Sequence, residues 1–155
     1  MAMTMSGEVA LPADRMTVWT ALNDPEVLKR CIPGTQELTK VSDTEFQATV
    51  RAAVGPVKAT FKGRVTLTDL DPPNAYRISG EGQGGVAGFV KGGASVRLAD
   101  AEAGGTLMAY DVEANVGGKI AQLGGRLING VAKKYADEFF ANFAKVLAGE
   151  SEEAK

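Results

Sequence analysis

Long stretches of the chain alternate strictly between apolar and polar residues. In residues 57–70, Val, Ala, Phe and Leu take most of the alternate positions, and most of the residues between them are Lys, Arg or Thr. Residues 45–54 and 106–116 alternate in the same way. A period of two is typical of β-strands that bury one face only. We therefore expect an antiparallel sheet with one face on the core and one in solvent.

Turn signals divide these runs at the spacing of β-hairpins. They are Ser42-Asp43, Gly55-Pro56, Asp71-Pro72-Pro73-Asn74 and Gly104-Gly105. With the shorter alternating run at residues 76–81, they predict a meander. Within the run at 57–70, Gly63 predicts a bend or a β-bulge.

Helical spacing appears at both ends of the chain. In residues 119–147 the apolar positions recur every three or four residues, which predicts one amphipathic helix about 40 Å long. Its apolar positions are Ile120, Leu123, Leu127, Val131, Tyr135, Phe139, Phe143 and Val146. Residues 12–22 and 24–31 predict two short helices, with Asp14 and Asp24 at their starts.

The order of these elements is a strand, two short helices, six strands and a long helix. It predicts an α+β fold in which a curved, antiparallel, seven-stranded sheet grips the C-terminal helix over a cavity. A chain of 155 residues is expected to form one domain. We place that domain at residues 1–149 and a short polar tail at 150–155.

The amino-acid composition excludes several classes of function. The chain has no histidine, so a histidine triad and the usual zinc site are excluded. Its net charge of −2 leaves no basic excess for a nucleic-acid partner. Cys31 is the only cysteine and lies in an apolar context before Ile32 and Pro33, with no histidine to activate it, which favours a buried, inert thiol over a nucleophile. We expect no metal and no other cofactor.

The chain start has neither the basic nor the apolar region of a signal peptide. No apolar run approaches the length of about 20 residues that spans a bilayer. We expect a cytoplasmic protein.

Two motifs resemble functional sites. Gly80, Gly82 and Gly85 match a dinucleotide-binding pattern, but no helix is predicted after them, so strand and turn glycines are the better interpretation. Asp111 and Glu113 share a strand face and suggest paired acid and base catalysis. The polar residues around them favour a solvated face instead.

The interior is the better candidate site, because many inward positions are small and leave room beneath the helix. We expect these residues to line a cavity and bind its ligand: Ile32, Val50, Phe61, Tyr76, Ile78, Met108, Tyr110, Leu123, Leu127 and Val131. The alternative is that they form an ordinary packed core.

The turns at 55–56, 84–90 and 117–118 should share one end of the meander, joined by the connection at 31–34. We expect that end to be the mouth of the cavity. As its gate we assign Pro33, Pro56, Val86, Phe89 and Val90. The apolar residues at 86–90 are a lid, a membrane-touching tip or a partner contact, unless they fold back as a plug of the core.

Four segments carry a resemblance to a known family. They are VALPA at 9–13, VWTALNDP at 18–25, LKRCIPG at 28–34 and GVAGFVKG at 85–92. With the order of elements, they resemble the carbon monoxide dehydrogenase G-subunit (CoxG) family of the START-like helix-grip superfamily. The resemblance implies a non-catalytic accessory protein of a molybdenum-containing CO dehydrogenase, related to lipid-binding domains and acting at the inner face of the cell membrane.

Three functions follow as hypotheses. The first is a non-enzymatic accessory protein that binds a lipid- or quinone-like molecule and assists membrane recruitment or electron transfer of such an enzyme. The second is a small enzyme of the polyketide cyclase or aromatase type, which needs polar groups converging in the cavity. The third is a protein-docking module with a solid core.

The missing histidines and the missing helix after the glycine motif generate a first prediction. Isothermal titration with zinc, NAD or ATP should give no saturable binding. A stoichiometric micromolar complex with any of the three would contradict the interpretation.

Overall fold

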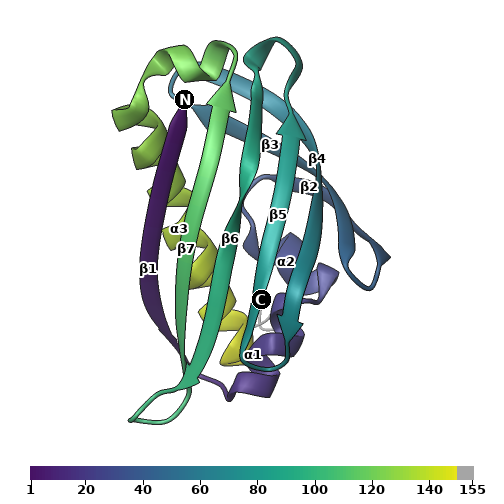
Figure 1. The fold of residues 1–155 in the computed structure, drawn as a ribbon, viewed down its shortest axis with the longest axis vertical. Coiled ribbons are helices and arrows are strands. Elements are labelled where there is room, and N and C mark those ends of the chain that lie inside the picture. The colour runs from purple at the N-terminus through teal and green to yellow at the C-terminus, as the bar shows by residue number, and fades with distance from the viewer. Residues whose placement is uncertain (150–155) are drawn as a thin grey trace.

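The computed structural model describes residues 1–149, in which a curved sheet wraps around one face of a long helix (Figure 1). The strands are β1 (Ala2–Leu11), β2 (Thr35–Ser42), β3 (Glu45–Val54), β4 (Val57–Asp71), β5 (Ala75–Gln83), β6 (Phe89–Asp100) and β7 (Thr106–Gly117). The helices are α1 (Arg15–Leu22), α2 (Pro25–Cys31) and α3 (Gly125–Leu147), with short 3-10 helices η1 (Gly85–Ala87) and η2 (Lys119–Leu123). The predicted tail lies outside the described residues.

All strand pairs are antiparallel, and the strands lie in the order β1-β7-β6-β5-β4-β3-β2. Strands β2 to β7 form the predicted meander, and β1 joins its end beside β7. The α+β fold with seven strands, two short helices and a long C-terminal helix is thereby confirmed.

Side chains that precede α1 and α2 cap them. The carboxylate of Asp14 accepts a hydrogen bond from the Thr17 backbone N–H at 3.1 Å, and hydrogen bonding to Thr17 lowers the pKa of Asp14. Asp24 accepts one from the Glu26 backbone N–H at 2.9 Å, and Pro25 occupies the first turn of α2.

The long helix differs from its prediction. It begins at Gly125, because Gly118 and Gly124 have φ angles of 81° and 94° and interrupt the helical path on either side of η2. The 23 residues of α3 make it about 35 Å long. None of the described helices combines the length and apolar character needed to cross a membrane.

Gly63 does not mark a bulge. The register of β4 passes through it unbroken, with Ala48 on one side and Gly82 on the other. A Cβ atom at Gly63 would lie 2.5 Å from the Glu81 backbone oxygen, so this glycine allows two strands to approach closely. The register shift of β4 lies between Thr68 and Asp71 instead.

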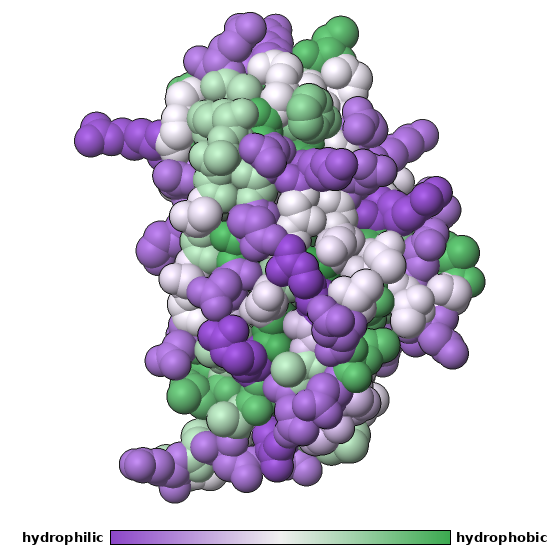
Figure 2. Space-filling model, in the orientation of Figure 1, coloured by the Kyte–Doolittle hydropathy of each residue, from purple (hydrophilic) through white to green (hydrophobic). Residues whose placement is uncertain are grey.

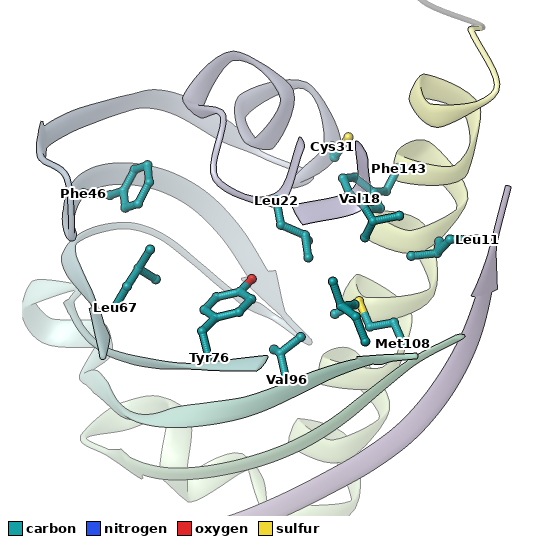
Figure 3. Close-up of a cluster of buried hydrophobic side chains, with 11 residues drawn as sticks. Leu11, Val18, Leu22, Cys31, Phe46, Leu67, Tyr76, Val96, Met108 and Phe143 are labelled. Carbon is teal, nitrogen blue, oxygen red and sulfur yellow. The ribbon is translucent and has the colours of Figure 1, made fainter. Parts of the chain in front are cut away.

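Two clusters of buried side chains hold the sheet to the helices. The larger one joins α1, α2 and the C-terminal half of α3 to the sheet (Figure 3). Its buried members are Leu11, Val18, Leu22, Cys31, Phe46, Leu67, Tyr76, Val96, Leu98, Met108 and Phe143. The smaller one joins η1, β7, η2 and the start of α3 at the opposite end, through Ala87, Val116, Ile120 and Ile128.

Two apolar positions on α3 differ in burial, which generates a prediction. Phe143 is fully buried, so Phe143→Ala should lower the free energy of unfolding by about 3–5 kcal/mol. Leu127 is 37% exposed, so Leu127→Ala should cost about 1 kcal/mol. Urea denaturation of both variants measures the difference. Equal losses would contradict this assignment of core and rim.

Candidate functional site

A band of small residues crosses the middle of the concave face of the sheet. The strand register makes it continuous, because Ala48 pairs with Gly63 and Gly63 with Gly82. One row further along, Gly80 pairs with Gly92 and Gly92 with Ala114. These positions carry no side chain beyond Cβ. The sheet therefore cannot fill the space beneath α3.

That space is an apolar cavity of about 330 Å³ between the sheet and α3, and its exposed wall has no polar atom. Its lining residues are Met3, Val50, Ala52, Val54, Phe61, Gly82, Val90, Val116, Ile120, Ile128, Val131, Ala132 and Tyr135. A second hollow of about 360 Å³ lies over the small-residue band and shares Val50, Phe61, Gly82 and Val90 with the first. Each is of the size that small-molecule sites have.

Tyr135 closes one side of the cavity. Strand β2 begins pairing with β3 only at Thr35 and Val50, so the backbone N–H of Ala53 has no strand partner on that side. The hydroxyl oxygen of Tyr135 accepts a hydrogen bond from it at 3.3 Å. The polar atom of this lining residue is thereby engaged with the backbone of β3.

The structure brings together some of the residues predicted to line a cavity. Val50, Phe61 and Val131 line the cavity beneath α3, and Ile78 lines the adjoining hollow.

Tyr76 and Met108 lie in the larger packed cluster instead. The ring of Tyr76 makes an edge contact with Trp19 at 5.1 Å between centroids, and burial raises the pKa of its hydroxyl. Tyr76 and Met108 point inward as predicted, but the helices α1 and α2 cover this end of the sheet.

Four more predicted residues lie away from the cavity. Tyr110 stacks on Phe140 at 5.2 Å and lines a groove between β1 and α3, beside the ion pair of Lys133 and Asp137. The others, which line neither apolar hollow, are Ile32, Leu123 and Leu127.

Only some of the residues predicted to form the gate lie at the cavity. Val90 lines the cavity and is 36% exposed, and Val86 on η1 is 93% exposed. The ring of Phe89 lies across Gly117 and lines neither hollow. Pro56 is exposed in the β3–β4 turn, whereas Pro33 is half-buried beside α2. Ala87, between the exposed residues, is buried as a plug of the smaller cluster.

Sequence reasoning assigned Leu127 to the cavity and did not assign Ile128. The inward-facing stripe of α3 includes Ile128, which is buried, and leaves Leu127 at its edge, whereas Val131 lies on the cavity as the spacing predicted. Val54 and Val116 were also unassigned, although both follow the alternation of their strands. The strand alternation was a usable signal, and the helical spacing was one at Val131 but not at Leu127.

The other candidate motifs take structural roles. Asp111 and Glu113 lie on the solvent face, where Asp111 pairs with Arg97 at 3.1 Å and Glu113 with Arg77. Gly85 starts η1, which has only three residues and offers no helix to a phosphate. Among residues 1–149, no three His, Cys, Asp or Glu side chains are grouped to hold a metal ion.

The small-residue band generates a prediction. A Cβ atom at Gly92 would lie 2.2 Å from the Glu113 backbone oxygen, so Gly92→Ala should destabilise the protein by about 1–3 kcal/mol. At Gly82 a Cβ atom would meet only Phe61, at 3.8 Å, so Gly82→Ala should change stability by less than about 1 kcal/mol. Urea denaturation distinguishes the two. Equal effects would contradict the described packing of the band.

Comparison with solved structures supports this architecture. A conserved protein from Geobacillus kaustophilus is 31% identical over 95% of this chain and 96% of its own, with a TM-score of 0.89. A protein from Rhizobium leguminosarum is 17% identical over 97% of each chain, with a TM-score of 0.72. The Zhui aromatase/cyclase from Streptomyces sp. R1128 is 13% identical over 96% of this chain and 94% of its own, with a TM-score of 0.68. The last two share the helix-grip fold.

No curated protein matches the chain. The family model for CoxG, the G subunit of carbon monoxide dehydrogenase, matches residues 7–148, which include every strand but the start of β1, all three helices and the whole of the cavity except Met3. The chain therefore belongs to the carbon monoxide dehydrogenase G-subunit (CoxG) family.

Proposed function

We propose that this protein binds a lipid- or quinone-like molecule in the cavity beneath α3, as a non-enzymatic accessory of a CO dehydrogenase-type molybdenum enzyme. The observation that carries the proposal is the cavity wall, which exposes no polar atom. A wall of this kind selects ligands by shape and apolar surface. It gives a charged or strongly polar molecule no partner to replace water.

The same wall argues against catalysis. Acid–base chemistry requires polar groups that converge on the reacting atoms. Of the residues that line the cavity, only Tyr135 has a polar side-chain atom, and that atom accepts a hydrogen bond from β3. The likeness to an aromatase/cyclase is a likeness of fold and brings no such groups with it.

The family supports the accessory role. An enzyme that oxidises its substrate must pass electrons onward, and quinones carry electrons in membranes. A bound quinone would therefore serve electron transfer, and a bound lipid would serve recruitment to the membrane. The docking-module alternative needs a solid interior, which two adjoining hollows of about 330 and 360 Å³ do not favour.

Filling the cavity tests the proposal. Gly82→Leu and Val131→Phe each place a larger side chain at a lining position. We expect both variants to bind decylubiquinone at least roughly 10-fold more weakly than the parent, because a few added carbons exclude a ligand from a matched apolar pocket. Intrinsic fluorescence quenching measures binding, and native mass spectrometry of gently extracted protein identifies any lipid or quinone that co-purifies.

Ala99→Leu is the matched control, since it adds three carbons on the exposed face of β6. It should leave binding unchanged. Unfolding curves should place all variants close to the parent. If folded Gly82→Leu and Val131→Phe bind the probe as tightly as the parent, the cavity is not the ligand site.

A further inference from the structure

The segments that surround the open end of the cavity carry only positive charge. They are the β3–β4 hairpin at 51–62, the β5–β6 connection at 82–91, and η2 with the start of α3 at 117–134. None of these segments contains Asp or Glu. Their cations are Arg51, Lys58, Lys62, Lys91, Lys119, Arg126, Lys133 and Lys134.

The opposite end of the molecule carries seven of the 19 acidic side chains. The ends of β4 and β6 and the β6–β7 turn, which lie near α1 in Figure 1, contain Asp69, Asp71, Asp100 and Glu102. The starts of α1 and α2 add Asp14, Asp24 and Glu26. The net charge of −2 therefore conceals an uneven distribution, in which the acid-free segments lie at the mouth and these acidic residues lie at the other end.

Lys133 pairs with Asp137, and the other cations at the mouth form no ion pair among the described residues. The ion pairs of residues 1–149 join Arg15 to Asp100, Arg64 to Glu45, Arg77 to Glu113, Arg97 to Asp111 and Lys133 to Asp137. Those pairs leave Lys58, Lys91, Lys119 and Arg126 without a carboxylate partner in this part of the chain. Their charge faces outward.

Apolar side chains stand exposed among these cations. We define the mouth tip as Pro56, Val86, Phe89, Val90 and Leu127. Val86 is 93% exposed, and the next three are 36–40% exposed. Figure 2 shows apolar atoms beside strongly hydrophilic ones at this end of the molecule.

Contacts at this end hold the mouth tip together. The side chain of Leu127 packs against Gly55 in the β3–β4 turn, and the ring of Phe61 packs against Gly84 beside η1. The backbones of Gly88 and Gly118 lie against each other, which joins η1 to η2. The mouth tip is therefore one surface built from three segments of the chain.

We infer that the mouth tip docks onto an anionic lipid bilayer, with its apolar side chains at the interface and the surrounding cations at the headgroups. Exposed apolar groups ringed by Lys and Arg fit such a surface, since burial of the former and attraction of the latter act together. This inference deepens the proposed function, because docking would open the cavity toward the phase in which lipids and quinones reside.

The separation of charge makes docking compatible with a net negative chain. At physiological ionic strength, charges interact over a Debye length of about 8 Å. Helix α3, which runs from the mouth toward the acidic end, is itself about 35 Å long. A docked bilayer would therefore be attracted by the near cations and screened from the distant acids. The same field would orient the protein with its mouth toward the membrane.

Co-sedimentation with vesicles free of quinone tests the docking. The parent should bind vesicles of phosphatidylcholine with phosphatidylglycerol, and should bind pure phosphatidylcholine weakly. The triple variant Lys58→Gln, Lys119→Gln, Arg126→Gln should lower the partition coefficient about 100-fold, because each cation near an anionic surface strengthens binding. Val86→Asp should lower it about 10-fold while leaving the melting temperature unchanged, since Val86 is exposed.

The matched control is Lys29→Gln, Lys40→Gln, Lys145→Gln, which changes the net charge equally at exposed positions away from the mouth. It should bind vesicles as the parent does. Equal losses in the two triple variants would overturn a localised surface. No binding to anionic vesicles, or a dimer in solution that Val86→Asp dissociates, would also overturn it by leaving the mouth tip to a protein partner or a second copy.

Two variants distinguish a failure of membrane docking from a failure of the proposed ligand binding. Val86 lines neither hollow, so Val86→Asp should bind decylubiquinone in detergent as the parent does. Gly82→Leu alters the cavity and leaves the mouth tip in place, so it should bind anionic vesicles normally. Loss of vesicle binding by Gly82→Leu, with the fold intact, would contradict the separation of the two surfaces.

Discussion

The close approach of backbones across the glycine band is the constraint on which the rest of this structure depends. At Gly63 and Gly92 a neighbouring carbonyl oxygen stands within 2.5 Å of where a Cβ atom would be. Larger residues would separate the strands and fill the concave face. The same residues therefore give the sheet its shape and leave space beneath α3, so the cavity is a consequence of how the sheet is built.

A cavity of this kind persists only where the surrounding walls are held apart. Here the helix α3 is anchored at both ends, by Ile128 in the smaller cluster and by Phe143 in the larger one. Both side chains are buried, and the hollow lies between them. The packed clusters supply the stability, so the middle of the sheet is free to serve a ligand.

Charge distribution adds information that composition hides. The summed charge of the 17 basic and 19 acidic side chains is close to zero. The fold gathers acid-free segments at the cavity mouth, and it places acidic turns at the far end. Electrostatic interactions decay over a distance much shorter than the molecule, so each end presents its own charge to a partner.

Strand alternation located four of the seven strands, β3, β4, β5 and β7, because a side chain on a half-buried strand has only two directions. The same alternation placed Val50, Phe61 and Ile78 on the concave face. Burial alone could not separate cavity from core: Tyr76 and Met108 face inward too, but α1 and α2 happen to cover them. The helical spacing placed Val131 on the cavity, but near the start of α3 it selected Leu127, which is 37% exposed, instead of the buried Ile128. Local sequence therefore determined which face each strand buries. Only the tertiary structure decided which buried side chains pack against another element and which line a cavity, because that depends on elements distant in the chain.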